Sequence, residues 1–192
     1  MRYFAYLLLS VILLPACSDK EENIVVPAPT MDYFDLNDQE LSFGTPRPVD
    51  FENDNNWDIL FSSIAIGDPV LRRDRHQFFI GTDIHVSLQV SNEETPVLAE
   101  GAVIGAVPLP EHHWYNGNGI GLAQRITPET GSPYWEGNWK DVSHKFIALQ
   151  LLRGGKPHFG WAEISIDSET EKMILHRAAI SREPSRAVKA GK

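Results

Sequence analysis

Apolar and polar residues alternate with a period of two through much of the chain after residue 31. The pattern is clearest in residues 77–90, where apolar side chains occupy almost every second position from Phe78 to Val90. Successive side chains of a strand point to opposite faces, so this pattern is typical of a strand with one face buried and the other in water. We therefore predict a strand of an antiparallel sheet in this segment.

Two further segments, residues 57–66 and residues 97–107, are rich in β-branched and aromatic residues and are also predicted as strands. Between residues 108 and 139 the chain is rich in Gly, Asn, Pro and Trp, and we predict a long loop there. Loops of this length are uncommon unless they are functional or disordered. This segment is therefore a candidate functional region.

The carboxyl-terminal part predicts three consecutive strands joined by short turns. Residues 145–152 and 158–166 flank Gly154 and Gly155, a pair typical of a hairpin turn. A second turn leads into residues 171–180. Strands that follow one another in this way form an antiparallel meander.

No segment shows a sustained 3.6-residue period with caps at both ends, so the fold class expected is all-β with about seven to ten strands. We predict an antiparallel two-sheet sandwich, jelly-roll-like, in a single domain of residues 31–192. With 192 residues, of which 42% are hydrophobic, the chain has the composition of one globular domain. Its 26 acidic residues outnumber 17 basic ones, so nucleic-acid binding, which depends on neutralising phosphates, is not expected.

The first 16 residues have the features of a secretory signal peptide. Arg2 is followed by an uncharged apolar run over residues 3–14. A run of this length is shorter than the roughly 20 residues that a membrane-spanning helix needs. We therefore predict that residues 1–16 are removed from an exported protein.

The only cysteine, Cys17, follows this segment directly. Residues 14–17, Leu-Pro-Ala-Cys, resemble the lipobox of bacterial lipoproteins. The resemblance implies cleavage before Cys17 and attachment of lipid to it, so that the protein is held at a membrane by acyl chains. If Cys17 carries lipid, the mature domain has no thiol for a disulfide, a catalytic cysteine or a cysteine-bound metal.

Residues 17–30 are expected to be a lipidated cysteine followed by a flexible tether. Lys20, Glu21 and Glu22 are similar to the surface-export signal of Bacteroidota lipoproteins, a Lys followed by two acids shortly after the cysteine. This resemblance implies an outer-membrane lipoprotein that faces the cell surface. A solvated charged tether without an export role is the alternative.

The folded part is similar to an uncharacterised group of secreted bacterial β-sandwich proteins. The likeness includes an Asp/Asn-rich turn that leads into a strand ending in Phe-Ser-Ser, at residues 57–63, and a hairpin resembling that group's "YLGLRF…G…HYGWARL" pattern at residues 146–164. It implies a secreted sandwich. It implies no activity.

The segment 50–58 is a candidate calcium loop. Asp50, Glu52, Asp54 and Asp58 place carboxylates at its first, third, fifth and ninth positions. Calcium binds six to eight oxygen ligands, and alternate residues of a tight loop can converge on it. The pattern is similar to the D-x-D-x-D-G-x-x-D loops of dockerin and integrin-type repeats. An acidic turn that opens a strand is the alternative.

A cluster of aromatic residues in the predicted long loop is a candidate ligand-binding platform. Trp114, Tyr115, Trp135 and Trp139 lie near Asn and Glu residues, and this combination suits sugar rings and their hydroxyls. Aromatic side chains also fill ordinary sandwich cores. Glycan contact and core packing therefore both stay open.

No catalytic motif is found in the sequence. There is no G-x-S-x-G, and no spacing singles out one of the strand histidines His85, His144, His158 and His176. We predict a non-catalytic, lipid-anchored envelope protein with a binding or structural role, possible calcium stabilisation and possible glycan binding. The alternatives are a glycan-active hydrolase and a structural or assembly lipoprotein with an envelope protein as partner.

Overall fold

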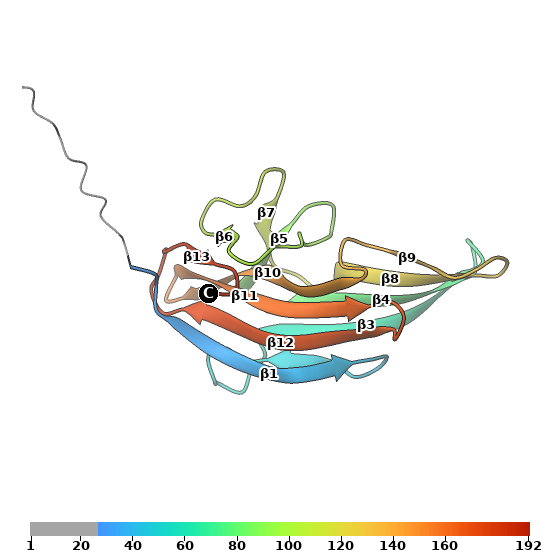
Figure 1. Ribbon diagram of the computed structural model, residues 1–192, viewed down its shortest axis with the longest axis horizontal. Helices are drawn as coiled ribbons and strands as arrows, with labels where there is room; N and C mark the ends of the chain where they lie inside the picture. Colours follow the sequence, from blue (N-terminus) through green and yellow to red (C-terminus); the bar gives the residue numbers. More distant parts are fainter. Residues whose placement is uncertain (1–26) are drawn as a thin grey trace, which may run out of the picture.

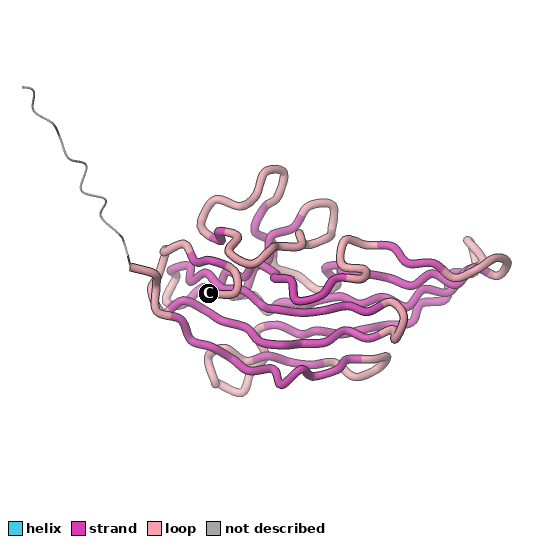
Figure 2. Tube along the Cα trace, in the orientation of Figure 1, coloured by secondary structure: helices cyan, strands magenta, loops and turns pink. Residues whose placement is uncertain are grey.

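Two antiparallel sheets stacked face to face make up the fold in the computed structural model, which describes residues 27–192 (Figures 1 and 2). The predicted signal peptide, Cys17 and the export signal lie outside the described residues. Within residues 27–192 all regular structure is strand, which confirms the all-β antiparallel sandwich expected from the sequence. No helix among these residues is long and apolar enough to cross a membrane.

The first sheet has six strands in the order β1-β12-β11-β10-β5-β7. Three of its strands, β10, β11 and β12, are the predicted carboxyl-terminal meander, and Gly154 and Gly155 both have the positive φ that the hairpin turn requires. The strands are β1 (Met31–Leu41), β5 (Val86–Val90), β7 (His113–Tyr115), β10 (Val142–Arg153), β11 (Lys156–Asp167) and β12 (Lys172–Ser181).

The second sheet has five strands in the order β2-β3-β4-β8-β9. A short pair, β6 with β13, stands apart from both sheets. The strands of the second sheet are β2 (Arg47–Val49), β3 (Ile59–Asp68), β4 (Arg73–Thr82), β8 (Ile120–Pro128) and β9 (Tyr134–Glu136), and the short pair is β6 (Val103–Ile104) with β13 (Val188–Lys189).

The main hydrophobic core lies between the two sheets. Its largest fully buried side chains include Trp139, Phe61 and Phe78. A second, smaller core lies on the outer face of the first sheet, where Phe159 and Trp161 are covered by β6, β13 and the carboxyl terminus. In Figure 1 this cover gathers over one end of the sheet. The other end of the outer face carries polar side chains.

Three predictions about individual segments are wrong. Residues 77–90 are not one strand: β4 ends at Thr82, a turn held by Asp83 follows, and β5 belongs to the other sheet. Residues 97–107 contain only the two-residue β6. The predicted long loop contains β8, a full strand of the second sheet. The first error arises because alternation can continue across a turn, so the period alone does not reveal a change of sheet.

Candidate functional site on the outer face of the first sheet

Irregularities in three strands of the first sheet lie at one level of the sheet. In β12 the extra residue is His176, because the ladder between β11 and β12 steps over it. In β1, residues 36–38 lie opposite that same position. In β10, Ser143 and His144 lie opposite Ser165 of β11. Bulges of this kind re-aim side chains and are over-represented next to active sites.

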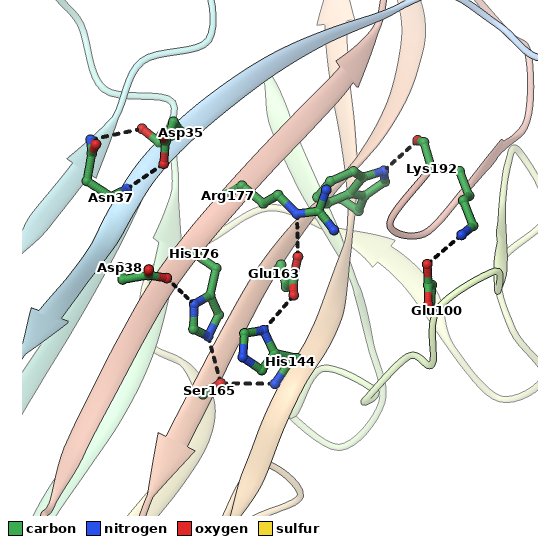
Figure 3. A network of polar contacts seen from close by, with 11 residues as sticks. Asp35, Asn37, Asp38, Glu100, His144, Glu163, Ser165, His176, Arg177 and Lys192 are labelled. Carbon is green, nitrogen blue, oxygen red and sulfur yellow. Dashed lines mark hydrogen bonds and ion pairs between the residues drawn. The ribbon is translucent and has the colours of Figure 1, made fainter.

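The bulges bring Asp38, His144, Ser165 and His176 together in a line across four strands, which we call the polar row (Figure 3). Asp38 has a φ of 48° and His144 a φ of 50°. Such left-handed conformations are costly for residues other than glycine, and they cluster at functional sites. The polar row is thus built on backbone that regular strands would not adopt.

A continuous hydrogen-bond chain connects three of these side chains. His176 Nδ1 lies 2.5 Å from Asp38 Oδ1, and His176 Nε2 lies 2.7 Å from Ser165 Oγ. The backbone N–H of His144 donates to the same Ser165 oxygen at 2.9 Å. Because an ionised carboxylate only accepts, Nδ1 carries the proton of a neutral His176, and Nε2 accepts from the serine hydroxyl.

A second set of contacts surrounds Glu163, which is 5% exposed. Its two carboxylate oxygens accept from His144 Nδ1 at 2.8 Å and from Arg177 Nε at 2.6 Å. The Arg177 guanidinium also lies 5.2 Å from the ring centre of Trp161, and the rings of His144 and His176 stack at 4.0 Å. These contacts join the two sets into one network.

The same contacts control the charge of Glu163. Burial disfavours its charged form, but hydrogen bonds from Arg177 and His144 outweigh burial and hold the pKa of this carboxyl below its ordinary value. Glu163 is therefore an ionised acceptor at neutral pH. It accepts hydrogen bonds from both Arg177 and His144 at the edge of the polar row.

Two open hollows beside the polar row have His144 and His176 in common. One, of about 590 Å³, is lined by Ser165. The other, of about 480 Å³, is lined by Arg177 and Tyr33. Tyr33 is 61% exposed and gives the second hollow an aromatic surface. The adjoining hollows can hold an elongated polar ligand across the row.

The predicted calcium loop has its carboxylates turned to different partners. Asp50 accepts hydrogen bonds from backbone N–H groups of the loop, including that of Asn53 at 2.6 Å, and Asp58 accepts from Phe51 at 2.5 Å. Glu52 pairs with Arg153. Among residues 27–192 no group of three or more His, Cys, Asp or Glu side chains is placed to hold a metal ion. Calcium binding by Asp50, Glu52, Asp54 and Asp58 stays a prediction.

The four aromatic side chains of the predicted platform lie in different parts of the fold. Trp139 is fully buried, and its indole N–H donates to the Thr95 carbonyl oxygen, so it cannot stack on a sugar. Trp135 stacks on Phe78 in the second sheet, whereas Trp114 packs on Phe159 in the second core. These three side chains fill space in the fold. Among the four side chains of the predicted platform, Tyr115 is the most exposed, at 45%.

The sequence did not single out the polar row, although it placed His144 and His176 on strands. The pattern that could have found part of it is the hairpin register. Counting residues outward from the Gly154–Gly155 turn places His144 of β10 opposite Ser165 of β11. The same count places both residues on the outer face of the first sheet. Nothing comparable points to Asp38, which lies in another strand far along the chain.

Comparison of the chain with protein-family models, with curated proteins and with solved structures found no match. The class of protein that the structure establishes is an antiparallel β-sandwich. Its polar row lies on the outer face of the first sheet.

Proposed function

We propose that the protein is a lipid-anchored envelope protein whose outer sheet face, displayed at the cell surface, binds a glycan. The observation that carries the ligand site is the alignment of three bulges at the polar row, with two residues other than glycine in left-handed conformation. Strain of this kind is kept where the surrounding structure over-determines it, which is typical of binding and catalytic sites.

The anchor part of the proposal is supported by the amino-terminal sequence and by where the chain joins the fold. Thr30 N–H donates to Glu183 at 3.1 Å, and Arg186 donates to the Pro27 carbonyl oxygen, so the chain before β1 is held at one end of the molecule. Asp38 lies seven residues beyond Met31 along β1. At about 3.3 Å per residue, this places the polar row roughly 20 Å from the tether.

The glycan part is supported by the chemistry around the adjoining hollows. Glu163 and Asp38 supply acceptors, and Arg177 and His144 supply donors, within a short stretch of surface. Tyr33 adds an exposed ring. Ligand sites combine apolar surface with a few placed polar groups, and a sugar offers hydroxyls for the polar groups and C–H faces for the ring.

Glycan-array binding of the full-length chain in detergent tests this proposal. Tyr33→Ala should weaken binding to the retained glycans about tenfold, equivalent to about 1.4 kcal/mol. Tyr134→Ala is the matched control, since Tyr134 is 44% exposed but belongs to β9 of the other sheet. Absence of any retained glycan, or equal losses in both variants, would contradict glycan binding at this face.

A further inference from the structure

We propose that the polar row is also a hydrolytic site for carboxylic esters, with Ser165 as nucleophile, His176 as general base and Asp38 as the residue that positions His176. The inference extends the proposed function and rests on it only for the alcohol part of the ester, a hydroxyl of the bound glycan. Its basis is the Asp38–His176–Ser165 chain, with contacts of 2.5 Å and 2.7 Å. The same connectivity of carboxylate, imidazole and hydroxyl recurs on unrelated folds that perform acyl transfer.

The protons in this chain are arranged as the reaction requires. With Nδ1–H of His176 directed at the Asp38 carboxylate, Nε2 is the acceptor for the Ser165 hydroxyl proton. The backbone N–H of His144 occupies a lone pair of Ser165 Oγ at 2.9 Å, so the hydroxyl hydrogen turns toward His176. A second histidine ring, that of His144, stacks on His176 and limits its rotation.

The reaction takes place in two balanced steps. Ser165 Oγ forms a bond to the ester carbonyl carbon while its proton passes to His176 Nε2; the bond from that carbon to the alcohol oxygen then breaks, and Nε2 protonates the departing alcohol. Water attacks the acyl-serine and gives its proton to Nε2. The carbon–Oγ bond breaks, Oγ regains the proton, and the carboxylic acid leaves. The net reaction is ester plus water to acid plus alcohol.

The surroundings of Ser165 suit this chemistry. Ser165 is 7% exposed and lines the hollow of about 590 Å³, so its exposed part faces the outer side of the sheet, where a substrate would approach. The His144 N–H, held there by the β10 bulge, donates to Ser165 Oγ and fixes the position of the attacking oxygen. The bulges therefore supply both the base and a donor.

The residues that line the two hollows indicate which half of the substrate binds in each. Most residues that line the hollow beside Ser165 are polar, but Ile174, which pairs with Ser165 in the β11–β12 register, gives it one apolar side chain, which suits a short acyl group such as acetyl. The hollow beyond the histidines includes Arg177 and Tyr33, which suit the sugar. The substrate class is accordingly an O-acylated glycan.

Labelling of the full-length chain with a fluorophosphonate probe, followed by peptide mass mapping, tests the nucleophile without any need to know the glycan. The expected result is one adduct on Ser165. His176→Ala should slow labelling at least about 100-fold, as expected for loss of a general base. Ser63→Ala is the matched control, because Ser63 is a serine of similar burial in β3 and its removal should leave labelling unchanged.

Hydrolysis of p-nitrophenyl acetate provides the second measurement. Asp38→Asn should lower kcat about 100-fold or more and leave KM within a few-fold, because p-nitrophenyl acetate carries no sugar for Asp38 to bind and Asp38 then acts only through His176. A wild-type chain without an adduct on Ser165 would overturn the inference, and so would hydrolysis that is unchanged in His176→Ala.

The two proposals fail in different ways. Glycan binding without labelling of Ser165 overturns the hydrolytic site and leaves the proposed function standing. Labelling of Ser165 without binding of any glycan supports the nucleophile and overturns the glycan as ligand.

Discussion

Two nearly buried carboxylates, Glu163 and Asp58, show how neighbours determine the sign of a pKa shift. Burial opposes the charged form of both. At Glu163, donors from Arg177 and His144 outweigh burial, and the pKa lies below its ordinary value. At Asp58, burial exceeds the effect of the single N–H of Phe51 and raises the pKa to about 6. Repulsion by the nearby carboxylates Asp83, Glu52 and Asp50 adds to this rise. Charged donors at Glu163 and acidic neighbours at Asp58 together account for the difference between the two pKa values.

The raised pKa of Asp58 predicts a specific pH dependence of stability. The folded state holds the Asp58 proton more tightly than the unfolded chain, in which Asp titrates near pH ~4. The contribution of Asp58 to the free energy of unfolding therefore falls as pH rises from about 4 to about 6 and is level above that range. Asp58→Asn keeps an acceptor for Phe51 N–H without the charge, so it should remove this fall and stabilise the protein at pH 7 by about 1–3 kcal/mol.

Urea unfolding between pH 4 and pH 7, in the presence of a chelator, measures this effect. Asp54→Asn is the control, because the Asp54 carboxyl is exposed and its pKa is lowered by hydrogen bonds from Asn56. A pH dependence in Asp58→Asn equal to that of the wild type would show that Asp58 does not carry this proton.

At the scale of elements, the bulges let consecutive residues of one strand face the same side of the sheet. Consecutive residues of a regular strand point to opposite faces. In β12, however, His176 contacts Ser165 and its neighbour Arg177 contacts Glu163, and both partners lie on the outward side of β11. The extra residue in β12 makes this possible. A site of charged and nucleophilic groups thus forms on a sheet whose opposite face is apolar core.

The loop at residues 50–58 carries the prediction that concerns calcium. If Asp50, Glu52, Asp54 and Asp58 bind the ion, the bound form must be favoured over the hydrogen bonds that these carboxylates make in the described structure. A metal that binds only the folded state stabilises it by about 2.7 kcal/mol at a hundredfold excess over Kd. Millimolar calcium should then raise Tm, and Asp54→Ala should remove most of the rise.

Magnesium at matched ionic strength is the control for the calcium prediction, since it requires a tighter octahedral site and dehydrates reluctantly. Equal shifts of Tm with both ions, retained in Asp54→Ala, would identify the loop as a solvated acidic turn whose carboxylates bind backbone N–H groups, Asn56 and Arg153.

At the scale of the whole molecule, both ends of the described chain lie at the covered end of the first sheet. Arg182 pairs with Asp32 at 2.6 Å, and Lys192 pairs with Glu100 at 2.5 Å. In Figure 1 the start of the described chain, drawn in blue, lies at the same end of the molecule as the carboxyl terminus. A tether to a membrane would therefore hold the covered end closest to it, and the polar row would lie farther along the sheet.

The anchor predicts how the full-length protein behaves in cells. Cys17→Ala should abolish metabolic labelling with a fatty acid and leave the signal peptide uncleaved by the lipoprotein peptidase. Replacement of Lys20, Glu21 and Glu22 by Ala should retain the lipid and reduce digestion by protease added to intact cells. Fatty-acid labelling of Cys17→Ala would refute the anchor, and unchanged digestion of the triple variant would refute the export signal.

Local sequence patterns were sufficient for the meander, because a Gly-Gly turn and a period of two specify a hairpin and its register without reference to distant residues. The strands β8 and β4 were harder to predict. In β8, turn-forming residues on both sides hid a buried strand, and after β4 the alternation ran through the turn at Asp83 into the other sheet. The first error missed a strand, and the second missed the change from one sheet to the other.

The sequence by itself determined the all-β fold, because it follows from short-range periodicity and turns, and a count outward from the Gly154–Gly155 turn could also have placed His144 opposite Ser165. Only the tertiary structure decided that His176 and Asp38 join them. His176 reaches Ser165 through a bulge that leaves no mark in the alternation, and Asp38 reaches His176 through the pairing of β1 with β12 across 138 residues of chain. Pairing of strands so far apart depends on which faces the whole chain buries, and no local pattern contains that information.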